Sequence, residues 1–390
     1  MRPWYAFLPF LAFMVAVTGG LHYYLYARLA RAPELESLQR IGSWVFLVGA
    51  ILTPLGIIGA RNLPRPFATV VAAVVFSWMG LIIIAFFLTL ASEPIRLALA
   101  ALKATNVVPD DPERRNFLAR ALSGLIALGA VGVAGYGMAS ALAPVVVKPV
   151  RVGLKKFPAG LGTFRIVQLS DVHIGPTIDG DWLQKVVARV NALEPDLVAI
   201  TGDLVDGSVD ELGEHVVHLR ELRAKHGVFF VTGNHEYYSG VDAWLAELTR
   251  LGVRVLRNEH VTIGEGEESF HLAGVDDWRS REFGRGHGPD LDRALHGRDP
   301  ARELILLAHQ PKQAIEAAKS GVGLQLSGHT HGGQIFPWGF FVKLEQGFVA
   351  GLDRVGEMLL YTSCGTGYWG PPMRVGAPAE ITLIEVQRQA

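Results

Sequence analysis

The sequence is short of cysteine and of net charge, and each shortage excludes a class of protein. Cys364 is the only cysteine among 390 residues, so an intrachain disulfide framework is excluded and the redox compartment is not indicated. The formal net charge is -1 at pH 7, which gives no reason to expect nucleic acid as a partner. Charge is also spread unevenly, because long stretches of the first 143 residues contain none.

Four blocks in this part of the chain contain no Lys, Arg, Asp or Glu. They are residues 4–25, 41–60, 67–91 and 122–143. Each is close to the ~20 apolar residues that cross ~30 Å of hydrocarbon. A buried helical core is the alternative, but such helices would show a polar face with a 3.6-residue period, which these blocks lack. We therefore expect a membrane domain at 1–143 with four transmembrane helices, at 4–25, 41–60, 67–91 and 118–143.

The fourth block differs from the other three in its flanks. Arg114 and Arg115 precede it, its interior is rich in Gly and Ala, and small residues crowd its end at 139–143. This pattern resembles a twin-arginine export signal, in which paired arginines and a mildly apolar core precede a cleavage point. An ordinary fourth helix with a basic flank is the alternative, and the sequence leaves both open.

Positive residues flank the expected helices unequally. One side of the membrane would carry Arg28, Arg31, Arg40, Arg96, Lys103, Arg114 and Arg115, and the other Arg2, Arg61 and Arg65. Lys and Arg favour the cytoplasm, so we expect a multi-pass protein of the cell membrane whose residues after 143 lie outside the cytoplasm. Lys148, Arg151, Lys155 and Lys156 argue the opposite, but large domains translocate largely regardless of charge.

From residue 144 onward, short apolar runs alternate with helical patterns. The runs at 164–170, 196–202, 227–233, 303–308 and 324–328 each lead into a polar motif. Helical patterns occur at 182–193, 209–225, 241–251 and 312–319. This alternation predicts an α/β domain at 144–390 with its ligands beyond the carboxyl ends of the strands. The run at 145–154 contains Pro149 and predicts an edge strand.

The polar motifs follow one another in a definite order. They are Asp171-Val172-His173, Gly202-Asp203, Gly233-Asn234-His235-Glu236, His309 and Gly328-His329-Thr330-His331-Gly332-Gly333. Each alone is common in loops and usually structural. Together they supply a bridging carboxylate with neutral N and O donors, which two divalent cations need in a phosphoester hydrolase. The candidate metal ligands are Asp171, His173, Asp203, Asn234, His309, His329 and His331.

These motifs resemble the calcineurin-like metallophosphoesterase family, in its bacterial branch with Ser-Asp-x-His-x-Gly and Gly-His-Thr-His-Gly-Gly-Gln-Ile blocks. The matching blocks are residues 170–175 and 328–335, and tail segments at 363–367, 371–374 and 378–381 are also similar. The resemblance covers about 145–386 and none of the three leading spans. It implies an α/β fold, a four-layer α/β/β/α sandwich of two mixed sheets, preceded here by the four transmembrane helices.

The resemblance also implies roles for the candidate residues. One metal would be bound by Asp171, His173 and His331, and the other by Asn234, His309 and His329, with Asp203 bridging both. His235 would contact the scissile phosphate and act as general acid, or stabilise charge, as the leaving oxygen departs. Asn234 would touch both metal and phosphate. The two divalent ions could be Mn, Fe or Zn, because all three occur in such sites.

We expect a membrane-anchored hydrolase of phosphomono- or phosphodiesters that uses in-line attack by a metal-activated hydroxide. The nearest alternative is a pyrophosphohydrolase of a lipid-linked nucleotide such as UDP-2,3-diacylglucosamine, which would need the cytosolic face. Intact ligands and His235 oppose a binding or sensor protein, and the charge-free blocks oppose a transporter. Aromatic residues that could contact substrate or only pack are Tyr237, Tyr238, Trp278, Phe283, Trp338, Tyr368 and Trp369.

Overall fold

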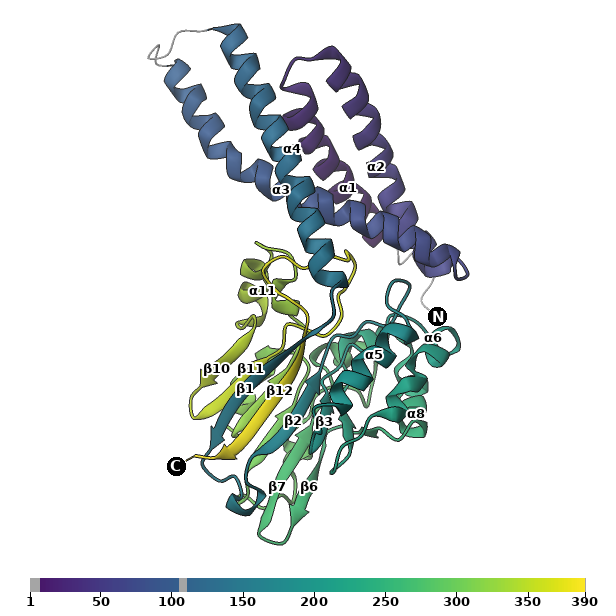
Figure 1. Cartoon of the computed structure of the whole chain (residues 1–390), viewed down its shortest axis with the longest axis vertical. Coiled ribbons are helices and arrows are strands. Elements are labelled where there is room, and N and C mark those ends of the chain that lie inside the picture. The colour runs from purple at the N-terminus through teal and green to yellow at the C-terminus, as the bar shows by residue number, and fades with distance from the viewer. Residues whose placement is uncertain (1–7, 105–110, 390) are drawn as a thin grey trace. The chain divides into compact units, whose positions relative to one another are not determined.

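The computed structural model describes residues 8–104 and 111–389. The chain divides into two compact units. The first comprises Met1–Ala139 with Gly370–Met373, and the second comprises Ser140–Trp369 with Arg374–Ala390. Among the described residues the first unit is helical, and the second contains the strands (Figure 1).

Long helices make up the first unit. They are α1 (Leu8–Leu25), a π-helical turn (Tyr26–Arg31), α2 (Glu36–Asn62), α3 (Phe67–Ala104) and α4 (Pro112–Leu142). Within 8–104 and 111–389, three helices are long and apolar enough to cross a membrane by length and composition: Glu36–Asn62, Phe67–Leu102 and Pro112–Leu142. The expected first span starts at residues 4–7, which lie outside the described ranges. The candidate spans thus number three rather than the expected four, and the span at 4–25 stays a prediction.

The third helix is longer than the sequence indicated. The charge-free block ends at Ala91, but α3 continues to Ala104 through Glu93 and Pro94. Glu93 accepts hydrogen bonds from Arg28 Nη2 at 2.9 Å and from the Tyr24 hydroxyl at 2.8 Å. Because a paired carboxylate costs far less to bury than an isolated one, the helix carries an acidic residue where its end was expected.

The fourth helix starts earlier than the expected residue 118. Asp111 Oδ1 accepts hydrogen bonds from the backbone N–H groups of Glu113 and Arg114, at 3.0 and 3.1 Å, and so caps the first turn. Pro112 stands at the first helical position, where its missing N–H costs nothing. Arg114 and Arg115 therefore lie within α4 itself, and cleavage after this segment stays a prediction.

The second unit contains two six-stranded mixed sheets (Figure 1). The first has the order β1 (Val146–Leu154), β12 (Glu380–Arg388), β2 (Phe164–Leu169), β3 (Leu197–Ile200), β4 (Val228–Phe230) and β5 (Arg254–Val255). The second has the order β10 (Gly351–Val355), β11 (Met358–Thr362), β9 (Leu324–Ser327), β8 (Leu304–Leu307), β7 (Glu268–Gly274) and β6 (Glu259–Glu265). The expected α/β class with mixed sheets is confirmed, and β1 is an edge strand.

Helices connect many of these strands. They are α5 (Gly180–Asn191), α6 (Val209–Val216), α7 (Asn234–Ser239), α8 (Val241–Arg250), α9 (Leu291–Leu295), α10 (Ala314–Ala317) and α11 (Gly339–Gln346). Short 3-10 turns occur at Ala159–Leu161, Val217–Glu221, Trp278–Phe283, Pro311–Gln313 and His331–Gly333. In α5, Asp179 Oδ1 caps the Trp182 N–H at 3.0 Å, and the helix then buries Leu183, Val187 and Val190 against the first sheet.

The strands beside the candidate motifs are buried on both faces. Along β3, Leu197 and Ala199 join the apolar core between the two sheets. Val198 and Ile200 point the other way, into the core beneath α5, α6 and α8. Along β8 the same alternation separates the inter-sheet core from the core beneath α9 and α10. The layers therefore run helices, sheet, sheet, helices.

Strand directions bring the polar motifs to one edge of each sheet. β2, β3 and β4 are parallel, and so are β7, β8, β9 and β11. The loops that follow these strands therefore leave from a common edge. β12 is antiparallel to β2, and β1 is parallel to β12. As a result β1 begins at the edge where β2 ends, and the chain enters the second unit at that edge.

A buried ion pair links the segment after β5 to the segment after β7. Arg257 Nε and Nη2 donate to Asp276 Oδ1 and Oδ2 at 2.9 and 2.7 Å, and the Asp276 side chain is 1% exposed. We expect Arg257→Leu to lower the free energy of unfolding by about 3–5 kcal/mol, because it leaves a buried carboxylate without a partner. Arg254→Leu removes only an exposed pair with Glu259 and should cost about 0–1 kcal/mol. Thermal unfolding of the full chain in detergent measures both, and equal losses would contradict this account.

The single cysteine is buried after β11. Cys364 is 6% exposed, and burial, reinforced by the neighbouring Glu380 carboxylate, raises the pKa of its thiol to about 11. At pH 8 the thiol is therefore protonated and shielded, and neutral thiols react poorly. We expect a disulfide reagent to leave the folded chain unmodified at pH 8 and to modify one thiol per chain after denaturation. Rapid reaction of the folded chain would show that Cys364 is accessible.

Candidate metal centre

All seven candidate ligands lie in the segments that directly follow the carboxyl ends of parallel strands. The loop after β2 supplies Asp171 and His173, and the loop after β3 supplies Asp203. Asn234 is the first residue of α7, which follows β4. In the second sheet, the loop after β8 supplies His309 and the loop after β9 supplies His329 and His331. The two sheets thus present their ligands at the same edge.

Many of these ligands have an unusual backbone conformation. Positive φ angles of 50–70° occur at Asp171, His173, Asp203, His329 and His331. A residue with a Cβ atom is uncommon in this left-handed region, and such strain concentrates at functional sites. Gly202, with φ of 85°, adopts a related conformation beside Asp203, and a Cβ there would lie 2.5 Å from the Gly233 nitrogen. The tight turns therefore aim the ligand side chains and bring the β3 and β4 loops together.

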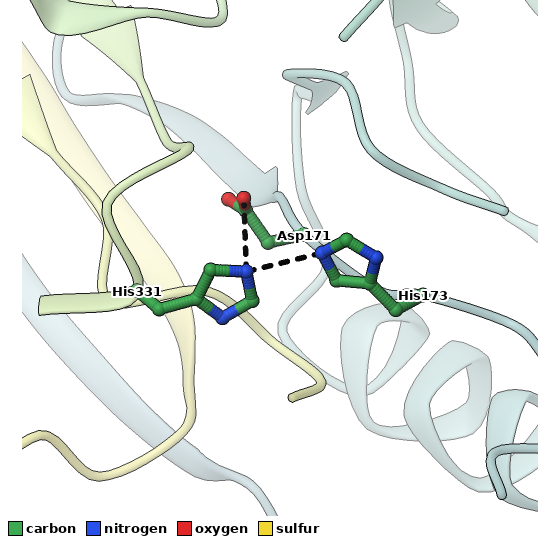
Figure 2. A group of neighbouring side chains, drawn as sticks. All are labelled: Asp171, His173 and His331. Atoms are coloured by element: carbon green, nitrogen blue, oxygen red, sulfur yellow. Dashed lines mark hydrogen bonds and ion pairs between the residues drawn. The ribbon is translucent and has the colours of Figure 1, made fainter. Parts of the chain in front are cut away.

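The first group of ligands is Asp171, His173 and His331 (Figure 2). His173 Nε2 lies 3.0 Å from His331 Nε2, and His331 Nε2 lies 3.4 Å from Asp171 Oδ1. Two imidazole nitrogens and a carboxylate oxygen therefore converge on one small volume, and all three residues are buried. Neutral imidazole and carboxylate are the donor types that Zn, Fe and Mn accept.

The second group is Asp203, His309 and His329. His309 Nε2 lies 3.1 Å from Asp203 Oδ2 and 3.2 Å from His329 Nδ1. The other ring nitrogen of His309 is 2.7 Å from the Thr201 carbonyl, which fixes the ring and leaves Nε2 directed at the group. Asp203 Oδ2 also lies 4.0 Å from His173 Nε2. One oxygen of Asp203 thus faces both groups.

Asn234 adds a neutral oxygen donor. Its side chain is buried, and among the described residues Asn234 Oδ1 has no hydrogen-bond partner. Burying an amide oxygen without a hydrogen-bond partner costs free energy unless another group binds that oxygen. The next residue donates its backbone N–H to Asp203 Oδ1 at 2.9 Å, which places Asn234 beside the second group. The Asn234 oxygen and the carboxylate and imidazole groups of the other six candidate ligands form a donor set that suits a cation.

Burial and neighbouring charges favour the ligand forms of His329, His331 and Asp203. The pKa of His309 shifts the other way, because burial alone would lower it but Asp203 outweighs burial and raises it well above its usual value. Burial lowers the pKa of His329 to about 3, with His309 adding to the effect. Burial also lowers the pKa of His331, so both rings are neutral and keep a lone pair. Burial alone would raise the pKa of Asp203, but His309 and His235 outweigh it and hold that pKa well below its usual range. Neutral imidazole and ionised carboxylate are the metal-binding states.

His235 lies beside the ligands and is paired with a carboxylate that the sequence interpretation missed. Asp206 Oδ1 is 2.5 Å from His235 Nδ1 and 3.1 Å from His173 Nδ1. Burial lowers the pKa of His235, but Asp203 and Asp206 outweigh it and raise that pKa to about 9. The ring is therefore protonated at pH 7, and its Nε2 lies 3.9 Å from Asp203 Oδ2. The sequence feature that could have indicated Asp206 as a site residue is its position three residues after Asp203, in the same loop.

Glu236 is a second residue whose role the sequence did not indicate. It is fully buried and accepts hydrogen bonds from the backbone N–H groups of Asp203, Leu204 and Gly233 at 3.1, 2.7 and 2.7 Å. Burial and the neighbouring Asp203 raise its pKa to about 7. Glu236 therefore ties the loops after β3 and β4 to each other. Its function is to position the ligand loops, because its oxygens are occupied by backbone donors.

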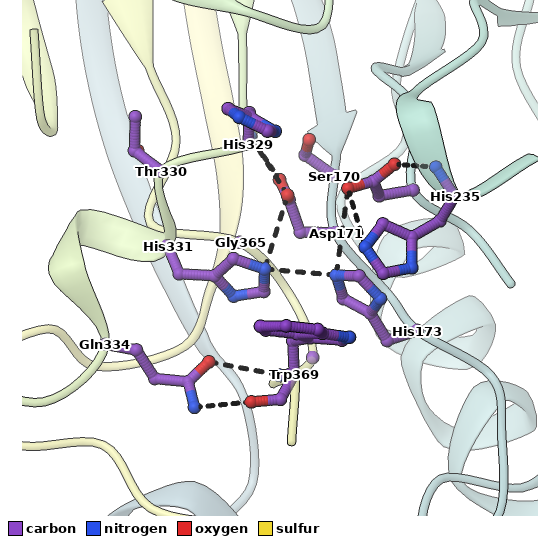
Figure 3. A network of polar contacts seen from close by, with 12 residues as sticks. Ser170, Asp171, His173, His235, His329, Thr330, His331, Gln334, Gly365 and Trp369 are labelled. Carbon is purple, nitrogen blue, oxygen red and sulfur yellow. Dashed lines mark hydrogen bonds and ion pairs between the residues drawn. The ribbon is translucent and has the colours of Figure 1, made fainter. Parts of the chain in front are cut away.

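Aromatic side chains surround the exposed side of His235. The Trp369 and Tyr238 rings lie 5.6 and 5.3 Å from the His235 ring, and both side chains are half exposed. Gln334 holds Trp369 in place through two hydrogen bonds to its backbone, at 2.9 and 3.0 Å (Figure 3). Among the other expected aromatic residues, Tyr237 and Tyr368 are buried and pack internally. A substrate that reaches His235 would therefore meet aromatic surfaces.

Comparisons with known proteins agree with this arrangement. A model of the calcineurin-like phosphoesterase family matches residues 164–333, which include all seven candidate ligands. A transmembrane protein with a metallophosphoesterase domain from Bos taurus is 44% identical over 262 residues, which are 64% of this chain and 59% of that protein. An uncharacterized metallophosphoesterase of Campylobacter jejuni is 33% identical over 387 residues, covering 98% of this chain and 99% of that protein.

A further relative comes from Helicobacter pylori J99, whose uncharacterized metallophosphoesterase is 39% identical over 277 residues, 70% of this chain and 73% of that protein. The chain spans about three fifths of the length of the cattle and zebrafish relatives that it matches. It spans nearly the whole length of the Campylobacter relative. From the shared motifs, the fold and these relatives we conclude that the chain belongs to the calcineurin-like phosphoesterase family of metal-dependent phosphoester hydrolases.

Proposed function

We propose that the second unit hydrolyses phosphomono- or phosphodiesters with the help of two divalent cations, Mn, Fe or Zn. The observation that carries the proposal is the convergence of two ligand groups on Asp203. Beside them lies Asn234 Oδ1, which has no hydrogen-bond partner within residues 8–104 and 111–389. In this proposal one cation would be held by Asp171, His173 and His331, and the other by Asn234, His309 and His329. Asp203 would bind both.

The chain's own residues provide the remaining chemistry. When bound, the two cations would neutralise charge on the phosphoryl group and lower the pKa of a water molecule. Asp206 holds His235 by Nδ1, which leaves the Nε2 proton directed toward the ligand groups. As the bond between phosphorus and the leaving oxygen breaks, His235 donates this proton to that oxygen. The leaving group therefore departs as a neutral alcohol.

We also propose that the second unit lies outside the cytoplasm. The support is the excess of Lys and Arg near the helix ends that face each other between the first and second expected spans and between the third and fourth. A reporter that is active only in the cytoplasm, fused after residue 390, should be inactive. An active reporter would show that the second unit lies in the cytoplasm and would contradict the proposal. No contact or charge within the described residues favours a pyrophosphohydrolase of a lipid-linked nucleotide, so we propose the hydrolysis of simple phosphoesters.

Hydrolysis by the full chain tests the proposed activity. The purified chain in detergent is stripped of metal, reloaded with Mn²⁺ and given p-nitrophenyl phosphate or bis(p-nitrophenyl) phosphate. We expect turnover only after reloading, because the bound cations would lower the pKa of the attacking water. Which of the two esters is preferred assigns the enzyme to monoesters or diesters. Turnover that is unchanged by metal removal would contradict the proposal.

A further inference from the structure

Three exposed apolar side chains lie on α11 and on the turn that precedes it. Phe336, Phe340 and Leu344 are 65%, 66% and 86% exposed. Their spacing of four residues places Phe340 and Leu344 on the same face of the helix, and the Phe336 and Phe340 rings lie 5.9 Å apart. We call these three residues the α11 stripe. Contiguous exposed apolar surface of this kind marks an interaction site more often than an inert surface.

Both ends of α11 are fastened to the loop that supplies two metal ligands. The helix follows the turn His331–Gly333, and a Cβ at Gly333 would lie 2.5 Å from the Gly339 nitrogen, so the two backbones are in close contact. Beyond the helix, Thr330 Oγ1 donates to the Val349 carbonyl at 2.5 Å. Whatever binds the α11 stripe therefore holds the loop with His329 and His331 as well.

The chain enters the second unit at the edge that carries this loop. β1 begins at Val146, at the edge where β2 ends, and the ligand loops leave from that same edge. α4, a candidate membrane span, ends at Leu142. Only residues 143–145 separate it from β1, and three residues extend over at most about 10 Å. A bilayer that contains α4 therefore lies within reach of the edge that bears the α11 stripe.

The charge around the stripe suits a lipid surface. Residues 331–344 contain no Asp or Glu and a single Lys, Lys343, which is exposed. Glu345 follows, and its carboxylate is paired with Lys312 Nζ at 2.8 Å. Aromatic side chains favour the interfacial layer of a membrane, and a basic residue nearby is attracted to anionic headgroups. An exposed helix with aromatic and Leu side chains on one face, whose acidic residue Glu345 is paired with Lys312, has the features of an interfacial helix.

We propose that the α11 stripe docks into the headgroup layer of the bilayer that contains the candidate spanning helices. Docking would turn the metal-ligand loop toward the membrane surface and hold it there. The lipid surface is the occupant that accounts together for the short link to α4, for the exposed Lys343 beside a paired Glu345 and for the aromatic side chains. The helices of the first unit, or a second copy of the chain, would instead cover the stripe with protein.

Fluorescent labels on the stripe test this proposal in the full chain. Phe340→Cys and Leu344→Cys chains are labelled with an environment-sensitive dye in nanodiscs of phosphatidylcholine and phosphatidylglycerol. The buried Cys364 stays unlabelled, and the unsubstituted chain checks this. Glu267→Cys is the matched control, because Glu267 is exposed in the turn between β6 and β7, where β7 begins rather than ends.

The proposal predicts blue-shifted emission at both stripe positions and loss of that emission when the lipids carry nitroxide in the headgroup layer. The control label should stay water-like and be quenched by iodide. In the Phe340→Cys chain, Leu344→Asp should return the label to water, whereas Leu344→Met should not. Stripe labels that iodide quenches would overturn the proposal, and so would labels that neither iodide nor lipid nitroxide reaches, because protein would then be the occupant. No readout needs hydrolysis, so the result is independent of the proposed activity.

Discussion

Replacing Asp203 by asparagine is expected to abolish metal binding and phosphoester hydrolysis together. Asp203 Oδ2 is 3.1 Å from His309 Nε2 and 4.0 Å from His173 Nε2, so one oxygen faces both ligand groups. Asparagine keeps the shape of the side chain but removes the negative charge that would hold a cation. The loss of kcat/KM should exceed the roughly 10- to 100-fold loss that follows removal of an outer partner of a metal ligand.

Metal content per chain and hydrolysis of bis(p-nitrophenyl) phosphate are the two measurements for this variant. Asp210→Asn is the matched control, because Asp210 is an exposed residue of α6 outside the ligand groups. The control should keep both metal and activity. Circular dichroism establishes that each variant is folded. A folded Asp203→Asn chain that retains metal and full turnover would show that the bridging assignment is wrong.

His235→Ala is expected to keep the metal but slow the chemistry by about 10²- to 10⁴-fold, the range typical of a general acid. The ring is protonated at pH 7, because Asp203 and Asp206 outweigh the effect of burial and raise its pKa to about 9. His235 is not one of the seven candidate ligands. Alanine at this position therefore removes a proton donor and leaves the two ligand groups in place.

The dependence on the leaving group separates proton donation from a purely structural role. Esters of alkyl alcohols need protonation of the leaving oxygen more than esters of p-nitrophenol do. The His235→Ala loss should therefore be larger for an alkyl phosphodiester than for bis(p-nitrophenyl) phosphate. His218→Ala, which alters a histidine of the 3-10 turn Val217–Glu221, should change neither rate. Equal losses for both esters in the His235→Ala chain would argue for a structural role.

The sequence predicted the strands and ligand loops well because each strand is a short apolar run that ends in a motif. β2, β3, β4, β8 and β9 all lie within the expected runs. Burial on both faces makes such strands continuous apolar segments, and parallel pairing then gathers their carboxyl ends. The alternation of strand and helix was therefore sufficient to place the candidate ligands at one edge.

Other features could not be read from residue patterns. α7 has only six residues and lacks a helical apolar period, so the helix that begins at Asn234 was not predicted. Asp206 and Glu236 act through contacts with residues of other loops, which spacing alone does not show. Glu93 was expected to lie beyond the third span, but its pairing with Arg28 and Tyr24 lets α3 continue. In each case a tertiary contact determined the outcome.

We propose that the chain binds two cations and that hydrolysis requires both. One titration tests this most directly. The metal-free full chain is titrated with Mn²⁺. Equilibrium dialysis gives the bound metal, and hydrolysis of bis(p-nitrophenyl) phosphate is measured in the same samples. We predict two ions bound per chain, with turnover that rises as the second ion binds. Binding of no ion or only one ion at saturation, or turnover already complete without metal, would contradict the account.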